Sequence, residues 1–257
     1  MISDKTIKKY LGKSIAIYPF DPSRIEGASL DLTASSFAWS ANKKKRIPID
    51  AQRKIIIQPK DTAIILTKEA IWLDKHFAGT CHARLKLGCK GLLFSNSPIK
   101  PGWVGRLTIS IYNNTDKPQE LKCGEPIAVV MLYKLKSAAT ITAGIGTSNR
   151  FDVLSSVGIP VDGPLQTKIN GSNNEFADSK RIVEAMQKSR EFIDYKRFKL
   201  NKSTLFTIAL ILICLGCSVG MILAHTKLKL AVELVCAVYT IIVVPLWTWV
   251  IDRLKNE

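Results

Sequence analysis

The sequence predicts a mainly β fold, a small barrel or sandwich, followed by a basic helix and two apolar helices. Short apolar runs recur at even spacing over residues 1–140, with Gly, Pro and Asn turns between them. Residues 141–178 lose this pattern, and residues 203–251 are almost continuously apolar. The 257 residues are therefore long enough for one core and an accessory region.

The first part of the barrel is predicted to contain a capped helix and several strands. Ser3 and Asp4 can accept the first free N–H groups of a helix that ends near Leu11. Pro19 and Pro22 prevent any continuation of that helix. Runs of apolar or alternating residues then predict strands at 25–33, 54–58, 63–67, 70–73 and 77–90.

The most regular strand pattern lies within residues 91–132. Its apolar and polar positions alternate strictly, with Leu107, Ile109 and Ile111 on one face and Thr108, Ser110 and Tyr112 on the other. This period of two predicts a half-buried strand. Turn residues flank it, at 101–102 before the strand and at 113–116 after it.

The charge of the chain predicts an anionic partner. The formal net charge is +16, and the basic residues gather in the first 140 residues and in 179–202. Such an excess favours phosphate-bearing ligands or lipid head groups. The four consecutive basic residues at 43–46 form either a solvated hairpin tip or a ligand site.

The six cysteines do not have the spacing of a structural zinc site, so no metal is predicted. The first thirteen residues have no apolar signal-peptide region. Together these features favour reduced thiols and a cytosolic β domain.

The region after the barrel is predicted to lead into a membrane. Residues 141–178 are rich in Gly, Ser, Asn and Pro, which predicts an irregular linker or an irregular tail that packs on a neighbour. Residues 179–202 predict a basic juxtamembrane helix, which anionic head groups would attract by about 1 kcal/mol per basic residue. The alternative is a solvated helical linker whose charges have no specific partner.

Two transmembrane helices are predicted at 203–225 and 230–251, because each apolar run would span roughly 30 Å or more as a helix. Only residues 226–229 separate them, so the pair forms a tight hairpin. Basic residues before position 203 outnumber those in this loop. The positive-inside rule then predicts a multi-pass protein of the cell inner membrane with both termini and the β domain in the cytoplasm.

Residues 1–135 contain several motifs that occur in the same order in one protein family. Residues 27–32 are similar to its early Ser-x-Asp-Leu strand, and RLKLGCKG at 84–91 is similar to its Arg-Ser-Ser-Leu-x-Arg-x-Gly phosphate motif. The turn IKPGWVG at 99–105 resembles Ile-Asp-Pro-Gly-Trp-x-Gly, and residues 58–69 and 113–127 match the neighbouring segments. By these motifs the chain resembles the dCTP deaminase / dUTPase family. The resemblance implies a distorted, dUTPase-like β-barrel and a homotrimer with nucleotide sites between subunits.

Several chemical positions of that family carry other residues here. The resemblance aligns Ser110 with the general acid/base Glu and Lys100 with an Asp near the sugar and the attacking water. Leu85 and Lys86 replace paired serines that would contact phosphates, and no triphosphate-covering C-terminal segment is recognisable. A serine hydroxyl does not shuttle protons near neutral pH as a tuned carboxylate does, so no catalytic residue is predicted.

The retained motif positions and their basic neighbours predict a ligand site in place of a catalytic one. The predicted ligand-binding residues are Asp31, Arg84, Lys86, Lys90, Lys100, Trp103 and Ser110. No cofactor is predicted, and Mg²⁺ is expected only if a nucleoside triphosphate binds.

The predicted function is a membrane-anchored, nucleotide-binding effector that acts on the membrane. It would sense a nucleotide or cyclic nucleotide, and by analogy of architecture it would serve in prokaryotic anti-phage defence. The first alternative is a membrane-tethered dCTP deaminase or dUTPase that acts on nucleotide pools. The second is a membrane scaffold without a nucleotide ligand.

Overall fold

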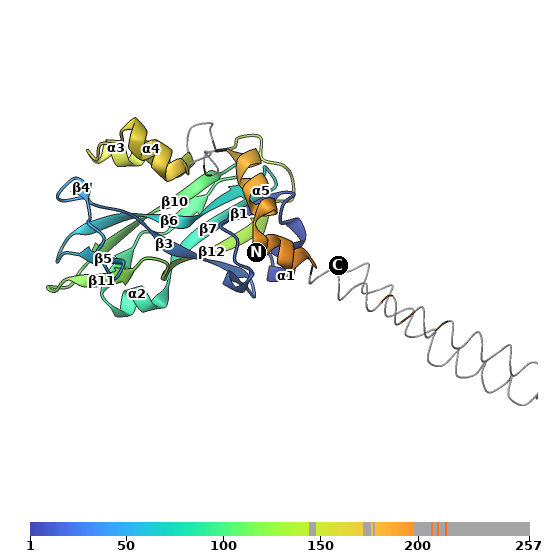
Figure 1. Cartoon of the computed structure of the whole chain (residues 1–257), viewed down its shortest axis with the longest axis horizontal. Helices are drawn as coiled ribbons and strands as arrows, with labels where there is room; N and C mark the ends of the chain where they lie inside the picture. Colours follow the sequence, from blue (N-terminus) through green and yellow to red (C-terminus); the bar gives the residue numbers. More distant parts are fainter. Residues whose placement is uncertain are drawn as a thin grey trace, which may run out of the picture. The chain divides into compact units, whose positions relative to one another are not determined.

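The computed structural model describes residues 1–143, 148–171, 176 and 178–197, together with the single residues 207, 210 and 214 (Figure 1). The chain divides into two compact units, residues 1–193 and residues 194–257. All of the described strands lie in the first unit. This unit ends at residue 193, well beyond the predicted barrel boundary at residue 140.

The described part of the first unit is mainly β, as predicted. Its strands are β1 (Ile15–Tyr18), β2 (Ile25–Glu26), β3 (Ser29–Ser40), β4 (Lys45–Arg46), β5 (Lys54–Ile57), β6 (Thr62–Leu73), β7 (Phe77–Ala83), β8 (Leu92–Phe94), β9 (Ser97–Ile99), β10 (Val104–Asn113), β11 (Gln119–Lys122) and β12 (Pro126–Lys134). The helices are α1 (Asp4–Tyr10), η1 (Pro22–Arg24), α2 (Leu85–Cys89), η2 (Ser148–Arg150), α3 (Phe151–Ser156), α4 (Gly163–Asn170) and α5 (Ser179–Lys188).

A ten-stranded antiparallel sheet forms the body of this unit, with the order β8-β10-β6-β3-β12-β7-β9 along its main path. The two edge strands, β8 and β9, are separated along the chain only by Ser95 and Asn96. Three residue steps span at most about 11 Å, so the two edges must lie close together at this point. The sheet therefore curls into an incomplete barrel, and the seam between β8 and β9 is its open side.

The sequence patterns account for the first helix and the central strand. Ser3 caps α1, because its Oγ accepts the backbone N–H of Thr6 at 3.4 Å. On β10 the predicted inward residues are buried, and Ile111 is completely inaccessible to solvent. The predicted outward residues, including Ser110, are only partly exposed.

The predicted strand over 77–90 is wrong in its second half. The strand β7 ends at Ala83, and helix α2 follows it at once. Gly91 then turns the chain at φ 71°, and a Cβ at this position would come within 2.5 Å of Thr115 Cγ2. This close approach explains why glycine stands between α2 and β8.

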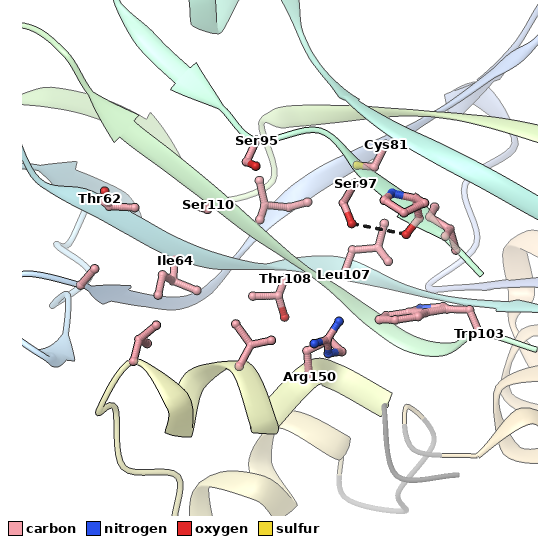
Figure 2. A pocket seen from close by; sticks show the side chains of 16 residues that line it. Thr62, Ile64, Cys81, Ser95, Ser97, Trp103, Leu107, Thr108, Ser110 and Arg150 are labelled. Carbon is pink, nitrogen blue, oxygen red and sulfur yellow. Dashed lines mark hydrogen bonds between the residues drawn. The ribbon is translucent and has the colours of Figure 1, made fainter. Parts of the chain in front are cut away.

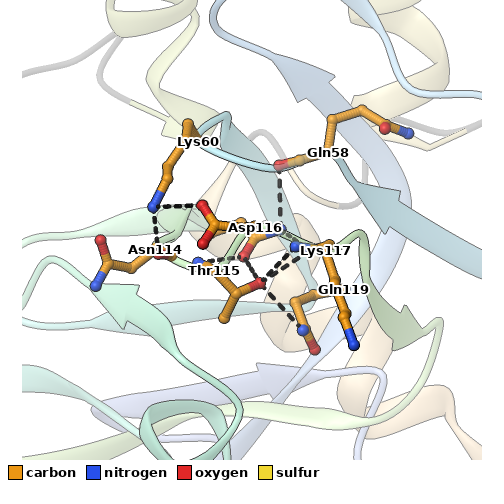
Figure 3. A network of polar contacts seen from close by, with 8 residues as sticks. Gln58, Lys60, Asn114, Thr115, Asp116, Lys117 and Gln119 are labelled. Atoms are coloured by element: carbon orange, nitrogen blue, oxygen red, sulfur yellow. Dashed lines mark hydrogen bonds and ion pairs between the residues drawn. The ribbon is translucent and has the colours of Figure 1, made fainter.

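Polar contacts around Thr115 and Lys117 hold the turn that follows β10 (Figure 3). A buried amide takes part in them. Asn113 is completely buried, and its Nδ2 donates to the backbone oxygens of Ile57, Gln58 and Lys117 at 3.0, 3.1 and 2.8 Å. Its Oδ1 accepts the Thr115 hydroxyl at 2.7 Å. One side chain thus joins the end of β10 to the turn between β5 and β6.

We expect Asn113→Ala to lower the free energy of unfolding by about 2–4 kcal/mol, because it leaves buried backbone groups without partners. Thermal and chemical unfolding of the full chain in mild detergent measures this loss. Asn114→Ala is the matched control, since Asn114 is exposed and its described hydrogen bonds are made by its backbone, whose N–H donates to the Gly91 carbonyl and whose oxygen accepts from Lys60 Nζ. Equal stability of the two variants would contradict this role of Asn113.

Within the segment 141–178, predicted as an irregular linker or an irregular tail that packs on a neighbour, residues 148–171 contain η2, α3 and α4 and cover one face of the sheet (Figure 1). Leu154, Ile159 and Ile169 from this segment are at most 1% exposed. They form one apolar cluster with side chains of β3 and β6, namely Phe37, Trp39, Ile64 and Leu66. We call residues 148–171 the tail; its apolar side chains have no regular period, so the sequence pattern did not reveal it.

A β-bulge attaches this tail to the sheet. The pairing of β10 with β6 shifts between Arg106 and Thr108, which removes two backbone N–H groups from the ladder. The N–H of Leu107 donates to Thr67 Oγ1 at 2.9 Å, and that of Arg106 donates to Asn149 Oδ1 at 2.8 Å. Asn149 is completely buried and adopts φ 59°, a left-handed conformation that asparagine tolerates better than most residues.

Helix α5 lies on the barrel through its apolar face. Ile182 and Met186 are completely buried, and the Ile17 N–H of β1 lies 3.4 Å from Met186 Sδ. The predicted continuous helix 179–202 is interrupted at Ser189, whose ψ of 140° is extended and whose hydroxyl donates to the Met186 carbonyl.

Among the described residues, no helix is both long and apolar enough to cross a membrane. The predicted transmembrane segments 203–225 and 230–251 lie outside the described residues, apart from the single positions 207, 210 and 214.

Candidate functional site

A cavity of about 380 Å³ lies at the seam of the barrel, and we call it the seam cavity (Figure 2). Strand β10 contributes one wall through residues 107–110. The link between the edge strands contributes Ser95, and the first residue of β9 contributes Ser97. The tail contributes Val153 of α3 and Val157, which directly follows that helix. The cavity thus exists because β8 and β9 do not pair with each other.

The polar groups of the seam cavity are mainly hydroxyls. They belong to Thr62, Ser95, Ser97, Thr108 and Ser110. The guanidinium of Arg150 and the thiol of Cys81 are the other polar side chains among the described lining residues, and Trp103 supplies an aromatic ring. Such a wall can hydrogen-bond a neutral polar ligand and pair with one negative charge.

Two side chains of the seam cavity stand out chemically, a thiol and an indole ring. The thiol is held in its neutral form, and the ring is held in one orientation. Burial raises the pKa of the Cys81 thiol to about 12, so the thiol stays neutral and a weak nucleophile at physiological pH. Trp103 donates its Nε1–H to the backbone oxygen of Gly105 at 3.1 Å, which fixes the ring against the cavity.

The predicted ligand-binding residues fall into two groups. Trp103 and Ser110 line the seam cavity, whereas Lys100 is exposed in the preceding turn and does not line it. Arg84, Lys86 and Lys90 lie at α2, on another part of the sheet. The structure of one chain therefore brings Trp103 and Ser110 together but leaves the phosphate-motif residues elsewhere.

Two members of the second group, Lys86 and Lys90, border a cavity of about 650 Å³, which we call the basic cleft. It is lined by Lys54, Lys86, Lys90 and Lys122 and by Glu120, Glu125, Cys123 and Gly124. Lys86 Nζ donates to Glu125 Oε1 at 2.7 Å, and Lys54 pairs with Glu120 at 2.6 Å. An anionic ligand of this cleft would have to compete with these two carboxylates.

Arg84 stands directly before α2 and pairs with Asp31 of β3. Its Nε is buried and makes no hydrogen bond within the described part of the chain. An unsatisfied buried donor is costly, so this atom is suited to an acceptor from a ligand or from another chain.

The family model for dCTP deaminase-like proteins matches residues 1–135, which include both groups of residues. The chain belongs to the dCTP deaminase-like family. Its barrel is similar to the dCTP deaminase of Pyrococcus horikoshii, with 33% identity over 124 residues that cover 48% of this chain and 78% of that protein. A dUMP-forming dCTP deaminase of Corynebacterium efficiens is 26% identical over 165 residues, covering 57% of this chain and 86% of that protein.

A solved structure of the 2′-deoxycytidine 5′-triphosphate deaminase from Agrobacterium tumefaciens also aligns with the chain. It shares 15% identity at a TM-score of 0.44, over 51% of this chain and 47% of that one. The tail and α5 lie outside the matched residues 1–135, so the family match describes only the barrel of this chain.

Sequence reasoning missed two residues of these sites. Glu125 was placed in a matching motif but not paired with Lys86, because that contact joins α2 to the turn before β12. Arg150 was not singled out, because it lies in the segment predicted to be a linker. No local pattern marks either contact, and both depend on the tertiary fold.

Glu125 makes the basic cleft sensitive to pH. Burial disfavours the charged carboxylate, but hydrogen bonds from Lys86 and the Lys122 backbone outweigh burial and hold its pKa below the ordinary value. A lowered pKa in the folded state means that ionised Glu125 stabilises the fold above its unfolded pKa.

We therefore expect Glu125→Gln to have a lower free energy of unfolding than the wild type at pH 7. The loss should be at most about 1 kcal/mol, because the lysine partner is exposed and water screens the pair. The difference should disappear as the pH falls through the folded pKa, because the wild-type carboxylate is then protonated. Unfolding curves at pH 7 and pH 3.5 measure both values. A stability gap that is the same at both pH values would contradict this account.

Proposed function

We propose that this dCTP deaminase-like chain is a membrane-anchored effector that binds a nucleotide without converting it. The observation that carries the proposal is the set of polar groups around Ser110, which are hydroxyls, a neutral thiol and a guanidinium. Attack of water on a cytosine ring requires a group that exchanges protons near neutral pH, and none of these side-chain types does so readily. The resemblance assigns Ser110 to the position of the general acid/base Glu.

The proposed ligand is a nucleotide or cyclic nucleotide, and the proposed assembly is a homotrimer. The seam cavity has the size and the polar wall for a nucleobase and sugar. The basic cleft and Arg84 offer positive charge for phosphates, but the basic cleft is a separate cavity of the same chain, and Arg84 does not line the seam cavity. A neighbouring copy would supply the second group, and the buried, unsatisfied Arg84 Nε supports such a ligand or copy.

The membrane part of the proposal rests on the sequence of residues 203–251. Its two apolar runs would form a transmembrane hairpin in the cell inner membrane, with the barrel in the cytoplasm. Basic residues of α5, such as Lys180, Arg181 and Lys188, are exposed and would face anionic head groups. Ligand binding would then act on the clustered hairpins, and anti-phage defence is the proposed setting.

A second candidate is a membrane-tethered deaminase. Family membership favours it, because relatives with about one third of their residues identical to this barrel are named dCTP deaminases. In that case the proton-transfer groups would come from residues other than Ser110, and Mg²⁺ would accompany a triphosphate substrate. A scaffold that binds no nucleotide is the third candidate.

Nucleotide binding and turnover distinguish these candidates. We expect the full chain in detergent to be stabilised against heat by at least one member of a panel of dCTP, dUTP, dCMP and cyclic nucleotides, with no deamination or pyrophosphate release. Arg84→Gln should weaken the stabilisation by about tenfold in apparent affinity, since it removes a charged hydrogen-bond donor.

Arg24→Gln is the control for this measurement, because Arg24 also pairs with an aspartate, Asp21, but lies away from both cavities. If the wild type forms product from dCTP or dUTP and Arg84→Gln does not, the chain is an enzyme instead. Stabilisation by no nucleotide would leave only the scaffold.

The membrane action has its own test. Cells that express the full chain should become more permeable to a membrane-impermeant dye than cells that express residues 1–202. The two proteins differ only in the predicted hairpin, so equal permeability would remove the effector from consideration while leaving nucleotide binding intact.

A further inference from the structure

Arg150 reaches the seam cavity from outside the region that the family match covers. It lies at the start of α3, in a left-handed conformation with φ 46° and ψ 46°. The preceding residue, Asn149, is also left-handed, and its buried side chain accepts a hydrogen bond from the Arg106 N–H of β10. In Figure 2 the Arg150 side chain rises from the tail toward Thr108 of β10.

Asp152 currently engages one edge of this guanidinium. Arg150 Nε donates to Asp152 Oδ1 at 3.0 Å, and Nη2 donates to Oδ2 at 2.9 Å. The carboxylate is 58% exposed and does not line the cavity, so it holds the arginine from the solvent side. The Arg150 Nη1 makes no hydrogen bond to the described residues and remains available to a second acceptor.

The described lining of the seam cavity is therefore net positive. Among its described lining residues, Arg150 carries the single positive charge and no side chain is a carboxylate. The hydroxyls of Ser97, Thr108 and Ser110 can bind an acceptor or a donor, but they do not distinguish an anion from a neutral ligand. Discrimination by charge must come from the guanidinium, which binds phosphoryl oxygens in a forked geometry.

We propose that Arg150 is the anion-binding, specificity-determining residue of the seam cavity, and that Asp152 is its built-in competitor. The inference rests on the proposed function, since it takes the ligand to be a nucleotide. It adds the ligand class: a nucleoside with a phosphoryl group close to the sugar, small enough for a cavity of about 380 Å³. The phosphoryl group pairs with Arg150, and the base and sugar contact the hydroxyl wall.

Substitutions of the two residues of this ion pair should change dCMP binding in opposite directions, and this difference tests the inference. Binding of dCMP and of uncharged deoxycytidine is measured by calorimetry on the full chain in detergent. We expect Arg150→Ala to weaken dCMP binding about tenfold and Arg150→Lys to weaken it less. Asp152→Asn should tighten dCMP binding about two- to fivefold, because it removes an exposed competing carboxylate. Deoxycytidine binding should be unchanged in all three variants.

The outcomes separate this inference from the proposed function. If the ion pair only supports the tail, both Arg150→Ala and Asp152→Asn will weaken binding, which overturns the inference alone. The inference alone is also overturned if the wild type binds dCMP and Arg150→Ala binds it equally well. Failure of the wild type to bind either probe overturns the inference and its nucleotide ligand together.

One further variant, together with Asp152→Asn, guards against loss of folding. Arg46→Ala, at an exposed arginine that lies over Phe37 of the apolar cluster between the tail and the sheet, should leave dCMP binding unchanged. If Arg150→Ala does not fold, the sign of the Asp152→Asn effect decides, because that change keeps the size of the side chain.

Discussion

The hydrogen bond from the Arg106 backbone to Asn149 is the constraint on which the arrangement of both the tail and the seam cavity depends. A bulge frees the Arg106 N–H from the ladder, and a buried free N–H is costly. Asn149 satisfies that group, and its Nδ2 continues the network to Asn170 Oδ1 at 2.7 Å. One amide therefore ties β10 to both ends of the tail, and the residue after it becomes part of the cavity wall.

The same region contains the ring contacts that lead to α5. The guanidinium of Arg106 lies 4.2 Å from the centroid of Phe176, and Tyr18 of β1 lies 5.6 Å from the same ring. Phe176 stands three positions before the start of α5, whose Met186 rests on the neighbouring Ile17. The tail, the bulge and α5 thus share a continuous set of contacts on one part of the sheet.

The sequence predicted the parts of the fold that depend on local pattern. The alternation on β10 and the cap at Ser3 were confirmed, because side-chain period and capping act within a few residues. The tail could not be predicted, because Leu154, Ile159 and Ile169 have no common period and find their partners on distant strands.

The site was predictable to the same limited degree. Motif positions identified Trp103 and Ser110 in the cavity, but motif order alone placed Lys100 with them, and the turn leaves Lys100 in solvent. Pro98 gives a physical reason for the cavity itself: it cannot donate a backbone hydrogen bond, so β9 is suited to be an edge strand. An unpaired edge beside the Ser95–Asn96 link leaves the space that the hydroxyls line.

A ligand that contacts both Arg150 and β10 would bridge the tail and the barrel. By linkage, it would stabilise the docked tail by about 2.7 kcal/mol at a concentration of one hundred times its dissociation constant. That amount is similar to the cost of about 1–3 kcal/mol for leaving a buried group such as the Arg106 N–H without its partner. Occupancy of the seam cavity would therefore strengthen the docking of the tail by about as much as the hydrogen bond between Arg106 and Asn149 does. Because the contacts of the tail continue through Phe176 to α5, binding without chemistry is sufficient to change the stability of the segment that precedes residues 194–257.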